Sequence, residues 1–266
     1  MHLPGCDSIR RGSGYGGGMC GRFAASASTE QIIETFQVEL VVDEPEPTYN
    51  AAPTDPVPAV VERLDKASGA AVRKLVTPRW GLVPSWSKDA KGAARMINAR
   101  AETVASKPAF AKAMVSRRCL IPADGFYEWT PTTGPDGKPA KQPWFIRPSG
   151  GGLFVMAGLY EFWKGPSRLA PIAPRGAEGT DDDVWLTTCT IITTRATDAL
   201  GHIHDRMPMT VRPEAWSDWL DPLQTDAQAA LGLLHASEGA EIDTYLVAPL
   251  VNNVRHEGPE LVRPLA

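Results

Sequence analysis

The sequence predicts an α+β fold, a single domain built on a bent, mostly antiparallel β-sheet or barrel with a few short peripheral helices. Most apolar stretches are short, rich in aliphatic and aromatic residues, and bounded by Gly and Pro, which is typical of strands. Strands and helices also do not alternate as they would in a parallel doubly wound sheet, and no P-loop or dinucleotide-binding glycine motif is present. With 266 residues and 43% apolar content, the chain is long enough to bury a full core.

The first predicted element is a helix that opens at the capping box Ser28-Thr-Glu-Gln31, with Ile32, Ile33 and Phe36 facing the core. Segments bounded by Gly and Pro are then predicted to be strands, at 56–63, 75–82, 144–147, 153–162, 184–194 and 242–247. Helical patterns and start signals predict three further helices, at 106–115, 213–220 and 226–235.

The domain is predicted to run from 19 to 266. Residues 1–18 are rich in glycine and lack an apolar run long enough for a signal peptide or membrane span, so we expect a non-native or disordered extension. An over-extended translation start, a disordered natural extension and a self-cleaved propeptide remain open. Residues 165–183 are rich in Pro, Gly and Ala and end in a run of acidic residues, which predicts a solvated loop insertion.

The cysteines and the net charge exclude several classes of protein. Four widely spaced cysteines without a C-x-x-C pair argue against a structural zinc site and a disulfide framework, so we expect neither metal nor cofactor. The expected location is a reducing cytoplasm, with nucleoid association if the protein is bacterial, and the expected state is a monomer without a membrane partner. The net charge of −4, or −5 without residues 1–18, excludes bulk attraction to nucleic acid and leaves a local basic groove open.

Cys20 directly follows Met19 at the head of Met19-Cys-Gly-Arg-Phe23. If translation starts at Met19, removal of the methionine leaves Cys20 with a free α-amine beside its thiol. These groups titrate near ~8 and ~8.5, so both are partly nucleophilic at neutral pH. Such an aminothiol condenses with an aldehyde to an imine and then closes a five-membered thiazolidine ring. The alternative is that Cys20 is a small buried side chain, as many cysteines are.

Further segments place polar groups beside Pro or Gly. They are Tyr49-Asn-Ala-Ala-Pro53, Trp80-Gly-Leu-Val-Pro-Ser-Trp86, Ile97-Asn-Ala-Arg-Ala-Glu-Thr103, Cys119-Leu-Ile-Pro-Ala-Asp-Gly-Phe-Tyr-Glu-Trp129, His202-Ile-His-Asp-Arg-Met-Pro208 and Asn253-Val-Arg-His-Glu-Gly258. In their order and spacing, from Met19 to about Leu261, these segments resemble the SOS response-associated peptidase (SRAP) family, whose members cross-link themselves to abasic sites in single-stranded DNA.

The resemblance implies that Cys20 is the nucleophile and that Asn98, Glu128 and His204 surround it. An abasic deoxyribose is mostly a closed hemiacetal, so an acid/base pair must open the ring and later help water leave the carbinolamine. Glu128 and His204 suit these steps, and the Asn98 amide could hold the Cys20 amine or a sugar hydroxyl. The implied activity is that of a sensor of abasic sites, with lyase-like chemistry, in the response to DNA damage.

The expected partner is single-stranded DNA that contains abasic sites. Arg22, Arg100 and Arg206 lie within two residues of proposed catalytic groups and could form a local phosphate clamp. Pro53 and Trp86 could cap an unstacked base, and core packing is the alternative for both. Thr193, eleven residues before His204, is expected to touch the sugar phosphate.

Two other functions remain open from the sequence. The same α-amine and thiol could attack an amide, which would make the chain an N-terminal-cysteine peptidase or autopeptidase. The chain could also bind single-stranded DNA without covalent chemistry, with Cys20 buried. A stable mass adduct with abasic DNA distinguishes the cross-linker from both.

Overall fold

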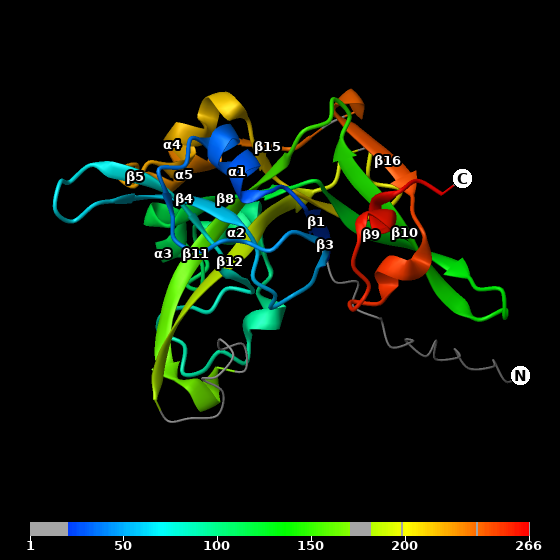
Figure 1. Cartoon of the computed structure of the whole chain (residues 1–266), viewed down its shortest axis with the longest axis horizontal. Coiled ribbons are helices and arrows are strands. Elements are labelled where there is room, and N and C mark those ends of the chain that lie inside the picture. Colours follow the sequence, from blue (N-terminus) through cyan, green and yellow to red (C-terminus); the bar gives the residue numbers. More distant parts are fainter. Residues whose placement is uncertain (1–20, 171–181, 198, 238, 266) are drawn as a thin grey trace, which may run out of the picture.

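A computed structural model of the chain describes residues 21–170, 182–197, 199–237 and 239–265. Within these residues the fold is α+β, mostly sheet with a few short helices, and the predicted fold class is confirmed. The strands form two open sheets and not a closed barrel, and their pairing is mostly antiparallel. Figure 1 shows helices α1, α4 and α5 toward the upper left, and strands β9, β10 and β16 toward the right.

The smaller sheet has five strands in the described part of the chain. Their order is β16 (Ile242–Leu246), β10 (Pro139–Pro148), β9 (Gly125–Thr133), β1 (Phe23–Ala25) and β3 (Thr48–Ala51). The paired strands in this sheet are antiparallel. The long β9–β10 hairpin forms its centre and projects beyond the other strands (Figure 1).

The larger sheet contains the remaining strands. Its main path is β13 (Arg206–Pro208), β12 (Asp183–Arg195), β11 (Phe154–Pro166), β8 (Arg118–Ala123), β4 (Ala59–Leu64), β5 (Ala71–Val76) and β2 (Leu40–Val41). Short strands join its margins, namely β6 (Arg79–Trp80), β7 (Asn98–Arg100), β14 (Thr210–Val211) and β15 (Leu234–His235). β6 and β7 pair with β12 in parallel, as β2 does with β5.

The helices are short. They are α1 (Thr29–Phe36), α2 (Ala101–Val104), α3 (Ala111–Ser116), α4 (Trp216–Leu220) and α5 (Ala227–Leu231). Single 3₁₀ turns lie at η1 (Ala93–Arg95), η2 (Ser167–Leu169), η3 (Pro213–Ala215), η4 (Gly239–Glu241), η5 (Pro249–Asn252) and η6 (Pro259–Val262).

The chain passes from the larger to the smaller sheet at Asp124 and Gly125, between β8 and β9. The Asp124 side chain accepts a hydrogen bond from the Ser26 amide at 2.7 Å, and its own amide donates to the Ala24 carbonyl at 2.8 Å. A Cβ atom at Gly125 would overlap the Ile146 carbonyl, so only glycine permits β10 to approach this bend. The bend leads directly into the strand that carries Glu128.

Alternation along the strands divides the core into layers. One face of β4 and β8 contributes Val61 and Ile121 to a cluster between the two sheets, where they meet Phe126 from β9. The opposite face contributes Val60 and Leu120 to a second cluster under α1, α3 and α4. The outer face of the smaller sheet packs against the C-terminal turns. The four layers are therefore helices, larger sheet, smaller sheet and C-terminal segment.

The first predicted helix is α1. The Ser28 hydroxyl accepts from the Gln31 amide at 3.2 Å, and the helix ends at Gln37, which adopts φ +53°. Ile32 and Phe36 are buried as predicted, and Ile33 is half-buried.

Some predicted boundaries were wrong, and proline accounts for two of them. The predicted strand 75–82 is broken at Pro78 into β5 and β6, and the predicted helix 106–115 begins only at Ala111, after Pro108. The predicted helix 226–235 ends at Leu231, because Gly232 caps it and the chain then forms β15. The helix predicted over 213–220 is a 3₁₀ turn followed by α4.

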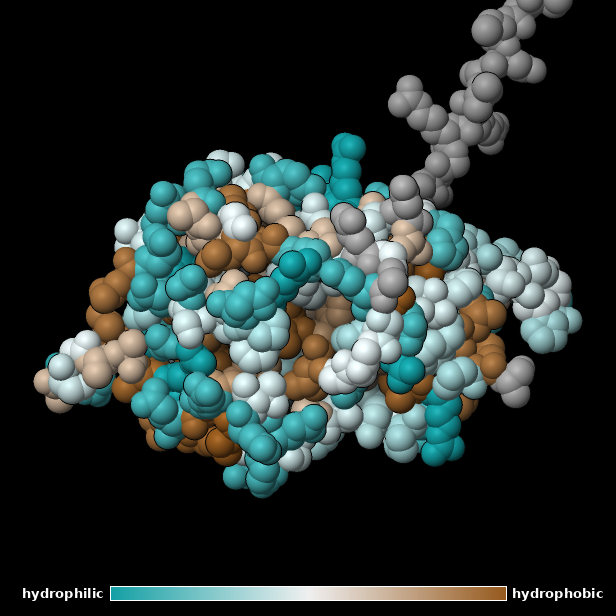
Figure 2. Space-filling view, turned by 90° about the horizontal axis from the view of Figure 1, so that it is seen from above, coloured by the Kyte–Doolittle hydropathy of each residue, from teal (hydrophilic) through white to brown (hydrophobic). Residues whose placement is uncertain are grey.

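Two predicted features fall mainly outside the described residues. The extension 1–18 and Cys20 lie outside them, as do residues 171–181 of the predicted loop 165–183. At the described start of that loop, β11 continues to Pro166 and η2 follows. None of the described helices is long and apolar enough to cross a membrane. The face seen from above is mainly hydrophilic, with separate hydrophobic groups around a central hollow (Figure 2).

Candidate active site

Glu128 lies in β9, on the face that looks toward the larger sheet. Its side chain is buried, with 3% of the residue exposed. In the β9–β10 ladder Glu128 pairs with Trp144 of β10, and the Trp144 indole makes an edge contact with the His202 ring at 5.9 Å between ring centroids. Strand alternation places Glu128 on the same face as Phe126, which belongs to the cluster between the sheets. The carboxylate therefore reaches the site from the smaller sheet.

His204 reaches the site from the larger sheet, in the loop between β12 and β13. Its Nδ1 atom lies 3.9 Å from Oε1 of Glu128 and 3.2 Å from Oδ1 of Asp205. The backbone amide of Arg206 donates a hydrogen bond to the same Nδ1 atom at 3.1 Å. Since that bond needs a lone pair on Nδ1, the neutral ring carries its hydrogen on Nε2. A proton added at Nδ1 would instead face two carboxylates.

Asn98 and Thr193 lie near the start of this loop. Thr193 belongs to β12, whose two edges pair with β7, which carries Asn98, and with β13. Asn98 pairs with Ile191 in the parallel β7–β12 ladder, and Thr193 has Arg100 on one side and Pro208 on the other. Asn98 is half-buried and Thr193 is fully buried. Arg100 is exposed. The structure thus brings the two motifs at 97–103 and 202–208 to one end of β12.

Arg206 is buried, with 7% of its surface exposed. Its two terminal nitrogens bond both carboxylate oxygens of Glu102, at 2.6 and 3.0 Å. One of these nitrogens also donates to the carbonyl and the hydroxyl of Thr193, at 2.7 and 3.3 Å. The hydrogen bonds from Arg206 hold the pKa of the Glu102 carboxyl below its usual value. Contact between Arg206 and a phosphate would require this arrangement to open.

The register of β1 against β9 connects the N-terminal motif to Glu128. Phe23 pairs with Phe126, and the Tyr127 amide donates to the Arg22 carbonyl at 3.0 Å, so the ladder continued by one residue puts Gly21 across from Glu128. Cys20 precedes Gly21 in the chain and lies outside the described residues.

A groove of about 620 Å³ begins at this point, lined by Gly21, Arg22, Pro53, Trp129 and residues of the β9–β10 hairpin and η5. Arg22 is half-buried, and its Nη1 donates to the Asn50 side chain at 2.5 Å and to the Val251 carbonyl at 3.0 Å. Burial lowers the pKa of its guanidinium. The structure therefore places the predicted Arg22 and Pro53 together.

Trp86 does not line this groove. Its side chain is 67% exposed, in the turn before Ser87, whose carbonyl accepts from the Trp163 indole at 2.8 Å. The core-packing alternative for Trp86 does not fit this exposure.

Asn50 is a residue of the site region that the sequence analysis did not single out. It is 1% exposed, accepts the hydrogen bond from Arg22, and donates to the Asn253 and His256 carbonyls at 3.0 and 2.9 Å. Its place in the motif Tyr49-Asn-Ala-Ala-Pro53, as a polar residue directly before two alanines, was the available signal. Asn50 ties the N-terminal strand to the last motif of the chain.

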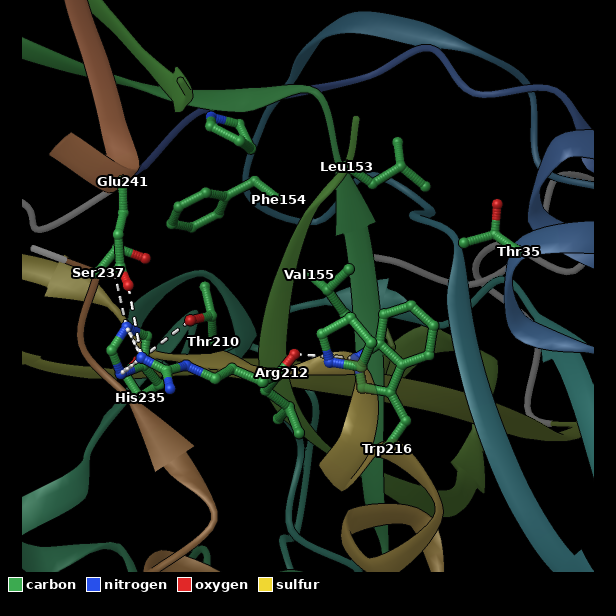
Figure 3. Close-up of a pocket in the computed structure, with 13 residues that line it drawn as sticks. Thr35, Leu153, Phe154, Val155, Thr210, Arg212, Trp216, His235, Ser237 and Glu241 are labelled. Carbon is green, nitrogen blue, oxygen red and sulfur yellow. Dashed lines mark hydrogen bonds and ion pairs between the residues drawn. The ribbon is translucent and has the colours of Figure 1, made fainter. Parts of the chain in front are cut away.

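A second pocket, of about 450 Å³, lies away from these residues, between α1, α4 and the starts of β11 and β15. Figure 3 shows Arg212, His235 and Glu241 gathered at one side of it and Trp216 at the other. The His235 ring bonds Glu241 at 2.7 Å. None of the predicted site residues lines this pocket. In the described ranges no group of three or more His, Cys, Asp or Glu side chains is arranged to hold a metal ion.

Comparisons with known proteins identify the family of this chain. The profile of the family described as SOS response associated peptidase (SRAP) matches residues 19–254. The chain belongs to the SRAP family. The predicted resemblance is therefore confirmed.

Two relatives cover most of the SRAP domain. The abasic site processing protein YoqW of Bacillus subtilis is 40% identical over 246 residues, which make up 92% of this chain and 99% of YoqW. The abasic site processing protein HMCES of Mus musculus is 32% identical over 249 residues, covering 82% of this chain and 65% of HMCES.

Solved structures show the same fold. A protein of Bacteroides thetaiotaomicron superposes with a TM-score of 0.71 at 22% identity, covering 93% of this chain and all of that one. A phage-related protein of Bordetella bronchiseptica gives a TM-score of 0.58 at 29% identity, covering 86% of this chain and 94% of that one.

Proposed function

We propose that this SRAP protein processes abasic sites in single-stranded DNA by forming a covalent thiazolidine link through Cys20. Relatives with matching domains are named abasic site processing proteins, which supports the substrate. The observation that carries the proposal is that the β1–β9 register, extended beyond Phe23 and Phe126, leads toward Glu128 from Gly21, the residue next to Cys20, and that the Glu128 carboxylate lies 3.9 Å from His204. A nucleophile and an acid/base pair then share one end of β1.

The reaction needs no cofactor. The ring-opened sugar presents a C1 aldehyde, and the Cys20 amine adds to it to give a carbinolamine. Loss of one water gives the imine, with a proton delivered to the leaving hydroxyl. The thiol sulfur then bonds C1, the thiol proton passes to nitrogen, and the thiazolidine closes. Glu128 and His204 supply and accept these protons, and Asn98 holds the amine or a sugar hydroxyl.

The DNA strand approaches along the groove beside Gly21. Arg22 and Arg100 hold phosphates, Pro53 and Trp86 cap unstacked bases, and the buried Thr193 and Arg206 support this surface from inside. Arg100 and Trp86 are exposed and are available to DNA without rearrangement. These contacts act locally, because the chain as a whole is acidic.

The mechanism requires Cys20 to carry a free α-amine, so we propose that the mature domain starts there and that residues 1–18 are not part of it. The family profile begins at residue 19, which supports this start. The decisive experiment compares protein produced from Met19, with the methionine removed, and protein that keeps residues 1–18. The first should form a denaturant-resistant adduct with single-stranded abasic DNA. Equal cross-linking by the second, with its extension shown intact by mass spectrometry, would exclude the thiazolidine mechanism.

Cys20→Ser is the matched variant. It keeps the amine and loses the sulfur, so it should yield only an imine that borohydride reduction traps. The family description also names a peptidase, and an N-terminal cysteine could attack an amide, for example in autoproteolysis. Cleavage of a supplied peptide with turnover would support that second activity. Tight binding without any adduct would support a non-covalent reader.

A further inference from the structure

Glu102 and Arg206 form a two-bond pair beside the proposed acid/base groups. Glu102 lies in the first turn of α2, and its Oε1 and Oε2 accept from Nη1 and Nη2 of Arg206, at 2.6 and 3.0 Å. A planar guanidinium that meets a carboxylate at two points has its orientation fixed as well as its position.

The pair is anchored to the centre of the larger sheet. The Arg206 Nη2 atom also donates to the carbonyl and hydroxyl of Thr193 in β12, at 2.7 and 3.3 Å. Thr193 is fully buried and Arg206 is 7% exposed, so the connection from α2 to β12 passes through the interior. The start of β13 is thereby held against both elements.

The backbone of Arg206 makes the contact that concerns His204. Its amide donates to Nδ1 of the ring at 3.1 Å, and this bond leaves the hydrogen of the neutral ring on Nε2. The ionisable groups around Nδ1 in the described part of the chain are Asp205 at 3.2 Å and Glu128 at 3.9 Å, and their carboxylate oxygens act only as acceptors for an N–H group at that atom. The Arg206 amide therefore favours an Nδ1 atom of His204 without a hydrogen, whereas the two carboxylates favour an Nδ1–H group.

We propose that Glu102 is a positioning residue, which holds Arg206 so that its amide keeps His204 as the Nε2–H tautomer. Without Glu102, the start of β13 keeps its ladder with β12 and loses its connection to α2, so that the Arg206 amide shifts relative to Nδ1 and the carboxylates of Asp205 and Glu128 recruit the hydrogen to that atom. The consequence for catalysis rests on the proposed function, because the Nε2–H group is then the one that donates to the leaving hydroxyl. This role of Glu102 requires Arg206 to stay engaged inside the protein.

The first test reads the tautomer without any DNA. ¹⁵N spectra of the imidazole rings would be recorded on the full chain, with the His204 signals assigned by their loss in His204→Gln. Wild type should show an unprotonated Nδ1 and a protonated Nε2, and Glu102→Ala should shift His204 toward the other tautomer.

The matched control is Glu62→Ala, which breaks a comparable pair. Glu62 accepts two hydrogen bonds from Arg73, each 3.0 Å long, and the pair lies on the β4–β5 hairpin, outside the candidate site. It should leave the His204 signals unchanged. Wild-type signals for His204 in Glu102→Ala would overturn the proposal, as would equal shifts in both variants.

The second test measures single-turnover cross-linking at saturating abasic DNA. Glu102→Ala should react about 10- to 100-fold more slowly, with a displaced pH profile, because a misplaced catalytic group costs rate more than affinity. Glu102→Gln should fall between, since its amide oxygen still accepts one bond from Arg206. A loss of DNA affinity with an unchanged rate would overturn the role of Glu102. If wild type forms no adduct, the proposed function fails. The ¹⁵N spectra of His204 in Glu102→Ala still test whether Glu102 is a positioning residue.

Discussion

Oε1 of Glu128 and Nδ1 of His204 lie 3.9 Å apart, although the two residues come from different sheets. The distance is too long for a direct hydrogen bond. A proton on Nδ1 would make it an ion pair, in a location where both side chains are largely buried. The proposed acid/base pair is thus a product of the packing between the sheets, and it exists only when β9 and the loop before β13 are held in place.

The first prediction concerns the effects of Glu128 and His204 on the cross-linking rate and on DNA affinity. Glu128→Gln and His204→Ala should slow cross-linking by about 10²- to 10⁴-fold, as expected for loss of an acid/base group, while DNA affinity stays nearly unchanged. Single-turnover rates and equilibrium binding would be measured separately. If Glu128→Gln lowered affinity tenfold and the bound complex reacted at the normal rate, Glu128 would be a binding residue.

The second prediction concerns phosphate contacts. Arg100→Ala should weaken binding of single-stranded DNA and reduce the slope of log K against log salt by about 0.7, the value for one phosphate contact on a single strand. Lys66→Ala, at an exposed lysine on the β4–β5 turn, is the control and should change neither quantity. An unchanged salt slope in Arg100→Ala would remove Arg100 from the interface.

The third prediction is a preference for single strands. In the proposed reaction the amine and sulfur of Cys20 approach the same C1 atom, so the sugar has to leave a stacked duplex, which costs a few kcal/mol. An acidic protein gains little general attraction to DNA to offset that cost. An abasic site in a single strand should therefore react much faster than one in an intact duplex. Rates on both substrates at one salt concentration and saturating protein provide the test, and comparable rates would contradict it.

The fourth prediction is a pH dependence of stability. Hydrogen bonds from Arg206 lower the pKa of folded Glu102, so this carboxylate stabilises the fold above its unfolded pKa of about 4.3. That stabilisation is lost as pH falls through the lower, folded pKa. Glu102→Gln should thus unfold at a lower temperature than wild type at pH 7, and the two should converge in acid. A melting difference that persists at the lowest pH at which both fold would contradict this.

The fifth prediction concerns the C-terminal segment. Asn50→Ala should lower the free energy of unfolding by about 2–4 kcal/mol, because two backbone carbonyls and the Arg22 guanidinium each lose a partner near the interior. Urea unfolding would measure the loss. Since Arg22 borders the groove, cross-linking should fall as well. A variant with wild-type stability would show that the segment is held by other contacts.

The fold class and the strands β4, β10, β11, β12 and β16 followed from local chemistry. Short apolar runs bounded by Gly and Pro marked the strands, and the Ser28 capping box marked α1, because these signals act between residues a few positions apart. The predicted strand 75–82 and the predicted helix 106–115 both ran through a proline. In the structure Pro78 interrupts the strand, and the helix begins only after Pro108. The strands β8 and β9 were not predicted as strands, because their Pro122 and Gly125 read locally as a turn.

The candidate site shows the same division. The sequence by itself determined which residue types stand in each motif, including Cys20, Asn98, Glu128 and His204. Only the tertiary structure decided that Glu128 and His204 meet, that Arg206 is occupied by Glu102, and that Asn50 joins Arg22 to the last motif. These contacts join residues 28 to 206 positions apart, and no periodicity or propensity acts over such separations. Sheet register and the packing of the two sheets bring them together, and both are properties of the whole fold.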